Sequence, residues 1–171
     1  MEEKVIKLNP TDVLVLKIET DKGEKTGEEL RFDLEDTQLF LRYEELIKKD
    51  KANRIELQNK LTIINKQEDV KAENLLSRNE KARLEAINDF FKKEIEVYNM
   101  FLGENGVQKL LNGRAMTWEA LDEIDEIIDK QIKPYLDINM QNITNKIKQK
   151  YSFNSKVSEE IEVLEWTDIK K

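Results

Sequence analysis

The segment Tyr98–Gly113, with the sequence YNMFLGENGVQKLLNG, decides how the helices of this chain are joined. It contains three of the five glycines of the whole protein. Glycine inside a helix costs roughly 0.5–1 kcal/mol relative to alanine, so a glycine-poor helical chain should avoid it there. The residues interleaved with these glycines are Phe101, Leu102, Val107, Leu110 and Leu111. We therefore predict a compact, buried corner between two helices.

Before this corner, apolar residues step by three or four, which is the strongest amphipathic pattern in the chain. They are Leu84, Ile87, Phe91, Ile95, Tyr98 and Phe101 or Leu102. Ser77 and Glu80 have the spacing of a capping box, so we expect this helix to begin there, after a connection over residues 66–76. Asn112-Gly113 provides a stop signal.

An earlier helix is expected to begin at Thr37, capped by Asp36. Its apolar stripe comprises Leu39, Phe40, Tyr43, Leu46 and Ile47, then Ile55, Leu57, Leu61 and Ile64. The charged segment Lys48–Arg54 separates the two halves of the stripe. We expect the helix to be solvated around that turn or to break there.

After the corner, Thr117 can cap a further helix. Its expected stripe is Trp118, Leu121, Ile124, Ile128, Ile132 and Tyr135. Pro134 lacks a backbone donor, so it either kinks this helix or opens the next one. Ile138, Ile143, Ile147 and Tyr151 indicate a last helix that ends near Ser152.

The N-terminal part has the period of β structure rather than of helix. Residues 13–18 are apolar at five of six positions, and Leu30, Phe32 and Leu34 alternate with polar residues. With a turn-rich loop over residues 20–27 between them, these arms predict a hairpin. Val5, Ile6 and Leu8 could add a short third strand. The predicted fold is mainly α, with long amphipathic helices and a small N-terminal β-hairpin.

Three regions follow from these patterns: a hairpin over residues 1–35, a helical domain over 36–153, and a mobile tail over 154–171. The 171 residues suffice for one domain with a real core. A formal charge of −7 disfavours a nucleic-acid partner, because phosphate binding needs clustered Lys and Arg. No apolar run reaches the ~20 residues needed to cross a bilayer, and the N-terminus has no apolar signal region. We therefore expect a cytoplasmic protein that binds neither nucleic acid nor membrane.

Catalytic and metal chemistry have few residues to use, since the chain has no histidine and no cysteine. The densest acidic cluster comprises Glu119, Asp122, Glu123, Asp125, Glu126 and Asp129. Without the Glu-x-x-His elements of a di-metal bundle, we interpret it as a solvated helix face. Gly103–Gly106 with Lys109 lacks the Lys-[Ser/Thr] step of a phosphate loop. We expect no enzyme, no cofactor, no metal and no catalytic residue.

The corner resembles the F-G-x-G-x-x-K-x-x-G corner of the small tail assembly chaperones of bacteriophages that infect Gram-positive hosts. The likeness also includes Phe32-Asp33, the segment Tyr43-Glu-Glu, and the segment Ile87-Asn-Asp-Phe-Phe91 that runs into the corner. Leu102 separates Phe101 from Gly103, and Asn105 and Val107 replace the small or hydroxyl residues usual there.

This resemblance implies a protein that coats the hydrophobic tape measure protein in the bacterial cytoplasm until the tail tube polymerises around it. We expect self-association through the N-terminal hairpin, which is too small to stand alone. Candidate partner-binding residues are Tyr98, Phe101, Leu102, Gly103, Gly106, Leu110, Leu111 and Trp166. Two alternatives remain open: a tail completion or neck component of the particle, and a helical adaptor that binds a host protein.

Overall fold

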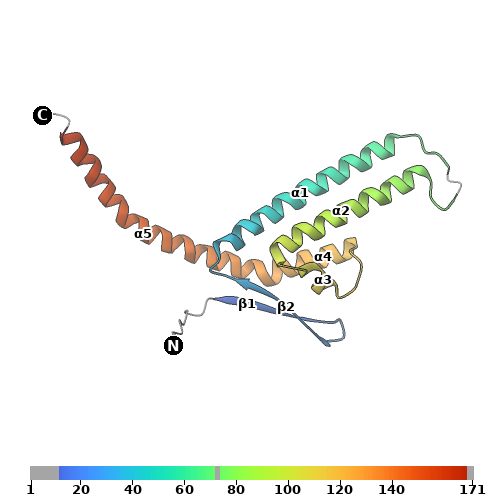
Figure 1. Cartoon of the computed structure of the whole chain (residues 1–171), viewed down its shortest axis with the longest axis horizontal. Helices are drawn as coiled ribbons and strands as arrows, with labels where there is room; N and C mark the ends of the chain where they lie inside the picture. Colours follow the sequence, from blue (N-terminus) through green and yellow to red (C-terminus); the bar gives the residue numbers. More distant parts are fainter. Residues whose placement is uncertain (1–11, 72–73, 169–171) are drawn as a thin grey trace, which may run out of the picture.

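The computed structural model describes residues 12–71 and 74–168, with side chains described up to Tyr151. The fold is mainly α with a two-stranded antiparallel hairpin at its start, as the sequence predicts (Figure 1). The elements, in chain order, are β1 (Val13–Glu19), β2 (Lys25–Asp33), α1 (Thr37–Lys66), α2 (Arg78–Leu102), α3 (Gly106–Leu111), α4 (Trp118–Ile127), the π-helical turn η1 (Ile128–Ile132) and α5 (Lys133–Asp168). The possible third strand at Val5, Ile6 and Leu8 lies outside the described residues.

The hairpin is closed by a shorter loop than we predicted. Leu14 pairs with Phe32 and Leu16 with Leu30, so the apolar residues of both strands share one face. The loop spans only residues 20–24, because Lys25 already pairs with Glu19. Gly27, expected in the loop, lies in β2 at a positive φ of 81°, next to a register shift in the pairing. A glycine at such a bulge lets the strand twist onto the helices.

Helices α1 and α2 form a long antiparallel pair, joined by the connection over residues 67–77 (Figure 1). Both predicted starts are confirmed. Asp36 accepts a 2.9 Å hydrogen bond from the Gln38 backbone nitrogen, and Ser77 and Glu80 form a complete capping box. Helix α1 does not break at its charged middle.

The predicted stripe of α1 is largely confirmed, whereas the buried face of α2 is rotated relative to its predicted stripe. In α1, Ile47 and Ile55 are about half exposed, whereas Leu39, Phe40, Leu46 and Leu57 are buried. In α2, Leu84 is exposed, and the buried apolar residues are Ala86, Phe90, Val97, Tyr98, Phe101 and Leu102. The α2 prediction was only partly correct, because α2 packs against α1 on one side and against α3 and α4 on another, so no single stripe describes it.

The glycine corner is compact and buried, as predicted. Gly103 ends α2 at a φ of 93°, and α3 begins three residues later. The Asn99 side chain spans the bend: its Oδ1 accepts a 2.8 Å hydrogen bond from the Val107 backbone nitrogen. Gly106 lies so close to α2 that an added Cβ would be 2.5 Å from Leu102 Cβ. Glycine is needed there for this close approach.

Pro134 lies inside a continuous helical run rather than between two separate helices. It is the second residue of α5, and the turn directly before it widens into η1, which accommodates a residue without an N–H. The buried stripe through this junction is Ala120, Leu121, Ile124, Ile128, Ile132 and Leu136. Trp118 and Tyr135, which we placed at the ends of the stripe, are instead partly exposed.

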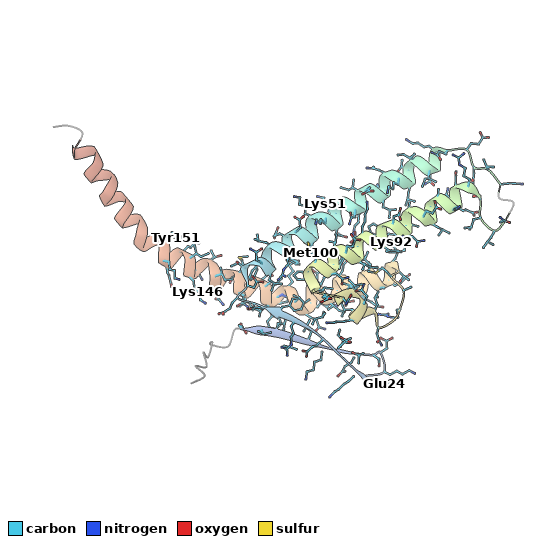
Figure 2. The ribbon with its side chains drawn as sticks, in the orientation of Figure 1. Glu24, Lys51, Lys92, Met100, Lys146 and Tyr151 are labelled. Carbon is cyan, nitrogen blue, oxygen red and sulfur yellow. The ribbon has the colours of Figure 1, made fainter. Side chains whose placement is uncertain are left out.

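Helix α5 is longer than expected. Its backbone stays helical to Asp168, whereas we expected an end near Ser152 and an irregular tail. Residues 152–168 contain no glycine or proline, so nothing in the sequence stops the helix. Figure 1 shows α5 extending away from the base of α1, so that the two helices diverge. Lys146 and Tyr151 lie on this projecting part (Figure 2).

Candidate functional site

A buried carboxylate lies in the interface between α1 and α2. Glu94 is 0% exposed, and its Oε1 accepts a 2.8 Å hydrogen bond from Asn53 Nδ2. Its Oε2 is also buried and has no partner among the described residues. Burial raises the pKa of Glu94 to about 7, and the neighbouring Asp50 carboxylate contributes to the increase. Near neutrality Glu94 is thus partly protonated.

Helix α4 joins the same polar cluster through Asp125. Its carboxylate accepts a short hydrogen bond from the Tyr98 hydroxyl and a 3.3 Å bond from Arg54 Nη2. Arg54 Nε also donates to Asp50 at 2.6 Å. Burial raises the pKa of Asp125, and burial together with Asp125 raises the pKa of Tyr98. The charged middle of α1 therefore faces a network that ties three helices together, and Asp125 is not on the solvated face that we predicted.

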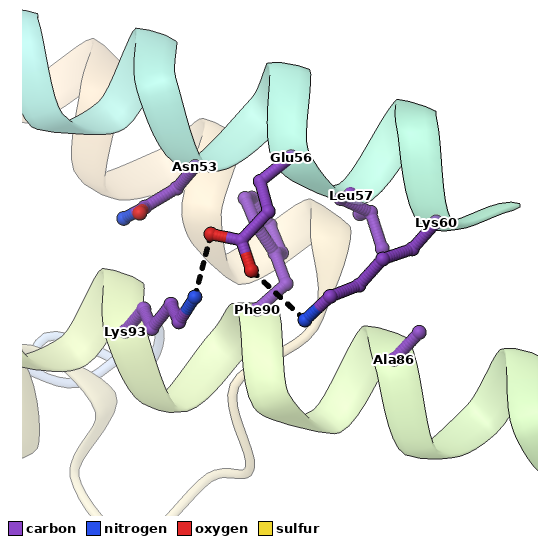
Figure 3. A pocket seen from close by; sticks show the side chains of 7 residues that line it. All are labelled: Asn53, Glu56, Leu57, Lys60, Ala86, Phe90 and Lys93. Atoms are coloured by element: carbon purple, nitrogen blue, oxygen red, sulfur yellow. Dashed lines mark hydrogen bonds and ion pairs between the residues drawn. The ribbon is translucent and has the colours of Figure 1, made fainter.

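A second ionic contact between α1 and α2 lies on the outer side of the pair. Glu56 accepts hydrogen bonds from Lys93 at 2.6 Å and from Lys60 at 2.9 Å (Figure 3). These bonds lower the pKa of Glu56 to about 2. The cavity beside them, lined also by Leu57 and Phe90, encloses about 10 Å³. That is room for about one water molecule, so this place is too small for a ligand.

An apolar groove lies beside the network, between α1 and the start of α4. Trp118 is 42% exposed and stacks on Phe90, with ring centroids 5.2 Å apart, and it also contacts Phe91. The groove, which we call the Trp118 groove, has a volume of about 380 Å³. It is lined by Arg54, Leu57, Gln58, Leu61, Thr62, Asn65, Phe90 and Trp118.

The Trp118 groove has the composition of a protein-binding surface. A half-exposed tryptophan held by other aromatic rings, with a polar rim, is a typical anchor position in protein interfaces. Arg54 belongs both to the rim and to the buried network, so the network fixes one wall of the groove. Within the described ranges, no group of acidic residues is arranged to hold a metal ion.

The residues that we predicted to bind a partner lie mostly inside the fold. Tyr98, Phe101, Leu102 and Leu111 are each less than 5% exposed, and Gly106 is buried too. Phe101 packs against Phe32 of the hairpin and Tyr43 of α1. These five residues therefore hold hairpin and helices together and offer little surface to a partner, which corrects the prediction at those positions. Leu110 is partly buried and Gly103 exposed, whereas the Trp166 side chain lies outside the described residues.

Sequence reasoning missed the actual groove. Trp118 was assigned to a buried stripe, and Glu94 was not singled out. The available signal was the place of Trp118 in the first turn of a helix, directly after the capping residue Thr117. A carboxylate at position 94, between Phe90 and Val97, was a second signal, because it interrupts an apolar face.

Comparisons of the chain with family models, with curated proteins and with solved structures return no match. In the part of the chain that is described, no helix is both long and apolar enough to cross a bilayer. Function is therefore inferred from the residues and their geometry.

Proposed function

We propose that the chain is a tail assembly chaperone, which binds the tape measure protein in the cytoplasm of a bacterial host and keeps it soluble until the tail tube forms. The proposal joins the sequence resemblance at the glycine corner with the geometry of the Trp118 groove. The groove is the observation that carries it, because it exposes an aromatic anchor on a rigid helical surface.

The chemistry of the groove suits an apolar, helical cargo. Leu57, Leu61 and Phe90 offer contacts to aliphatic side chains, and Trp118 offers a large face at low entropic cost. A polar rim can satisfy the flanking polar groups of the cargo. Elsewhere the surface is strongly charged, with 38% Asp, Glu, Lys and Arg in the chain, which keeps a coated cargo dissolved.

Many copies must line one long cargo, so the proposal includes self-association through the hairpin. Among the described residues, each strand of the two-stranded sheet has one edge without a strand partner, and Val13 and Val15 are exposed on the outer face of the sheet. Unpaired edges and exposed valines favour pairing with another copy. The expected assembly is built from edge contacts between hairpins.

Co-expression with the tape measure protein of the same genome tests the proposal. The cargo should move from the pellet to the supernatant and co-purify with the chain. Trp118→Ala should reduce the recovered complex, whereas Tyr135→Ala should not, although Tyr135 is equally exposed at 46%. Circular dichroism of both variants checks folding.

A tape measure protein that stays insoluble with the wild-type chain would overturn the proposal. Finding the chain in purified, mature particles would instead favour a tail completion or neck component. Equal effects of the two substitutions would move the cargo site away from the Trp118 groove.

A further inference from the structure

Helix α5 carries apolar side chains that the rest of the fold does not cover. Beyond its first turn, Met140, Ile147 and Tyr151 are exposed, and Ile143 is only partly buried. Ile143 and Ile147 line an open groove of about 500 Å³ with Glu35 and Thr37 at the base of α1. Exposed apolar residues that follow one face of a projecting helix indicate a helical partner.

The spacing of these residues is that of a coiled coil. Steps of three and four residues lead along α5 through eight positions: Met140, Ile143, Ile147, Lys150, Asn154, Val157, Ile161 and Leu164. Six of the eight are apolar, and the pattern spans more than three heptads of continuous helical backbone. An apolar repeat of this kind predicts a two-helix seam. We call these eight positions the α5 seam.

The charge of α5 changes sign along its length. Residues 133–151 contain four lysines and one aspartate, whereas residues 152–168 contain five acidic residues and one lysine. Two parallel copies would place like charges side by side. Two antiparallel copies place the basic half of each against the acidic half of the other, so the charge pattern fits a second copy of the same helix.

The two polar positions of the seam select one antiparallel register. When Met140 is opposite Leu164 of a second copy, Ile143 is opposite Ile161 and Ile147 opposite Val157. Lys150 then meets Asn154 at the centre, so that both polar positions face each other. A shift by one heptad would instead oppose Lys150 to Ile147 and Asn154 to Ile143, and a polar group opposite an apolar one in a seam is costly.

We propose that two copies of this chain associate through an antiparallel coiled coil of α5, centred near residue 152, with Lys150 of each copy opposite Asn154 of the other. This surface is separate from the hairpin and from the Trp118 groove. It does not depend on the chaperone function.

Ile147 and Ile138 provide a matched pair of test positions. Both are isoleucines on α5 with similar exposure, 50% and 58%, but nine residues apart they lie on opposite faces of the helix. Ile147→Glu should raise the dissociation constant by roughly tenfold or more, because it puts a charge in the seam. Ile138→Glu should leave it unchanged. Sedimentation equilibrium of the full chain at tens of micromolar measures both, with circular dichroism as the folding check.

Cysteine cross-linking tests the direction and register, and it is clean because the chain has no native cysteine. An equimolar mixture of Met140→Cys and Leu164→Cys chains should give a mixed disulfide dimer under mild oxidation. Met140→Cys alone should not cross-link, since the two copies of residue 140 would be about 36 Å apart.

Three results would overturn this inference. They are a monomeric wild-type chain, equal masses for the Ile147→Glu and Ile138→Glu variants, and a Met140-to-Met140 cross-link, which requires parallel helices. Loss of cargo binding in Ile147→Glu without a change in mass would assign the seam to cargo instead. Since the cross-link reports only on α5, a failure of the chaperone proposal would leave it intact.

Discussion

Asn53 on α1 donates a 2.8 Å hydrogen bond to the fully buried carboxyl group of Glu94 on α2. The second oxygen of that carboxyl has no hydrogen-bond partner among the described residues, and Asp50 and Arg54 are its charged neighbours on α1. Two further residues face these polar groups: Tyr98, which is also on α2, and Asp125 on α4. An interface of this kind is sensitive to protonation, because a buried acid without enough donors is stable only when it keeps its proton.

The stability of the fold should therefore fall as the pH rises from about 5 to 8. The pKa of Glu94 is about 7 in the folded chain, above its ordinary value of 4.5, so the folded state binds the proton more tightly than the unfolded state. Its contribution is complete below pH 4.5 and is lost as the pH rises through 7. The raised pKa of Asp125 acts in the same direction. Urea unfolding at several pH values measures this.

Glu94→Gln should remove most of that slope. Glutamine has the shape of the protonated acid and can donate to Asp50 while it accepts from Asn53. At pH 8 the variant should equal or exceed the wild type in stability. A wild-type curve that is flat between pH 5 and 8, or a variant with the same slope, would contradict the assignment of the slope to Glu94.

Tyr98→Phe should destabilise the fold by about 1–2 kcal/mol, since it leaves the half-buried Asp125 without its hydroxyl donor. Asp125→Asn should cost a similar amount, because it also weakens the bond to Arg54. In a double-mutant cycle the two costs should not add, as the two groups bond to each other. Strict additivity would show that the hydroxyl and the carboxylate act independently.

The sequence predicts the elements well and their packing less well. Asp36, Ser77 and Thr117 mark three helix starts correctly, since a cap depends only on nearby backbone groups. Period alone assigned the buried face of α1 but not that of α2, because α2 contacts neighbours on more than one side. The sequence also left open whether the charged middle of α1 is solvated or breaks the helix. Its hydrogen-bond partners, Glu94 and Asp125, come from distant parts of the chain.

The candidate site was harder to predict than the fold. Glycines at a corner indicate a tight bend, but the bend here is buried, so Phe101 and Leu102 serve packing rather than recognition. The Trp118 groove arises where α4 meets α1, a contact between residues far apart in sequence. The spacing of residues within one helix cannot predict a contact between two distant helices.

Gly106→Ala should destabilise the fold by about 1–3 kcal/mol. The added methyl group would lie 2.5 Å from Leu102 Cβ, which is attached to backbone and cannot turn away. Glu104→Ala, two residues earlier and exposed, should change stability by less than about 0.5 kcal/mol. Thermal unfolding compares the two. An unchanged Gly106→Ala variant would mean that α3 can move away from α2 without cost.

Trp118 should report directly on occupancy of its groove. The chain has two tryptophans, so Trp166→Phe leaves Trp118 as the single tryptophan, whose emission is excited selectively at wavelengths that tyrosine does not absorb. Its side chain is 42% exposed, and adding the tape measure protein should shift its emission to shorter wavelength and reduce quenching by acrylamide, because the cargo excludes water from the indole. The complementary Trp118→Phe chain, which keeps Trp166, distinguishes this signal from a change elsewhere. If the emission of Trp118 stays constant while the cargo is demonstrably bound, the cargo occupies another surface, and the Trp118 groove loses its role.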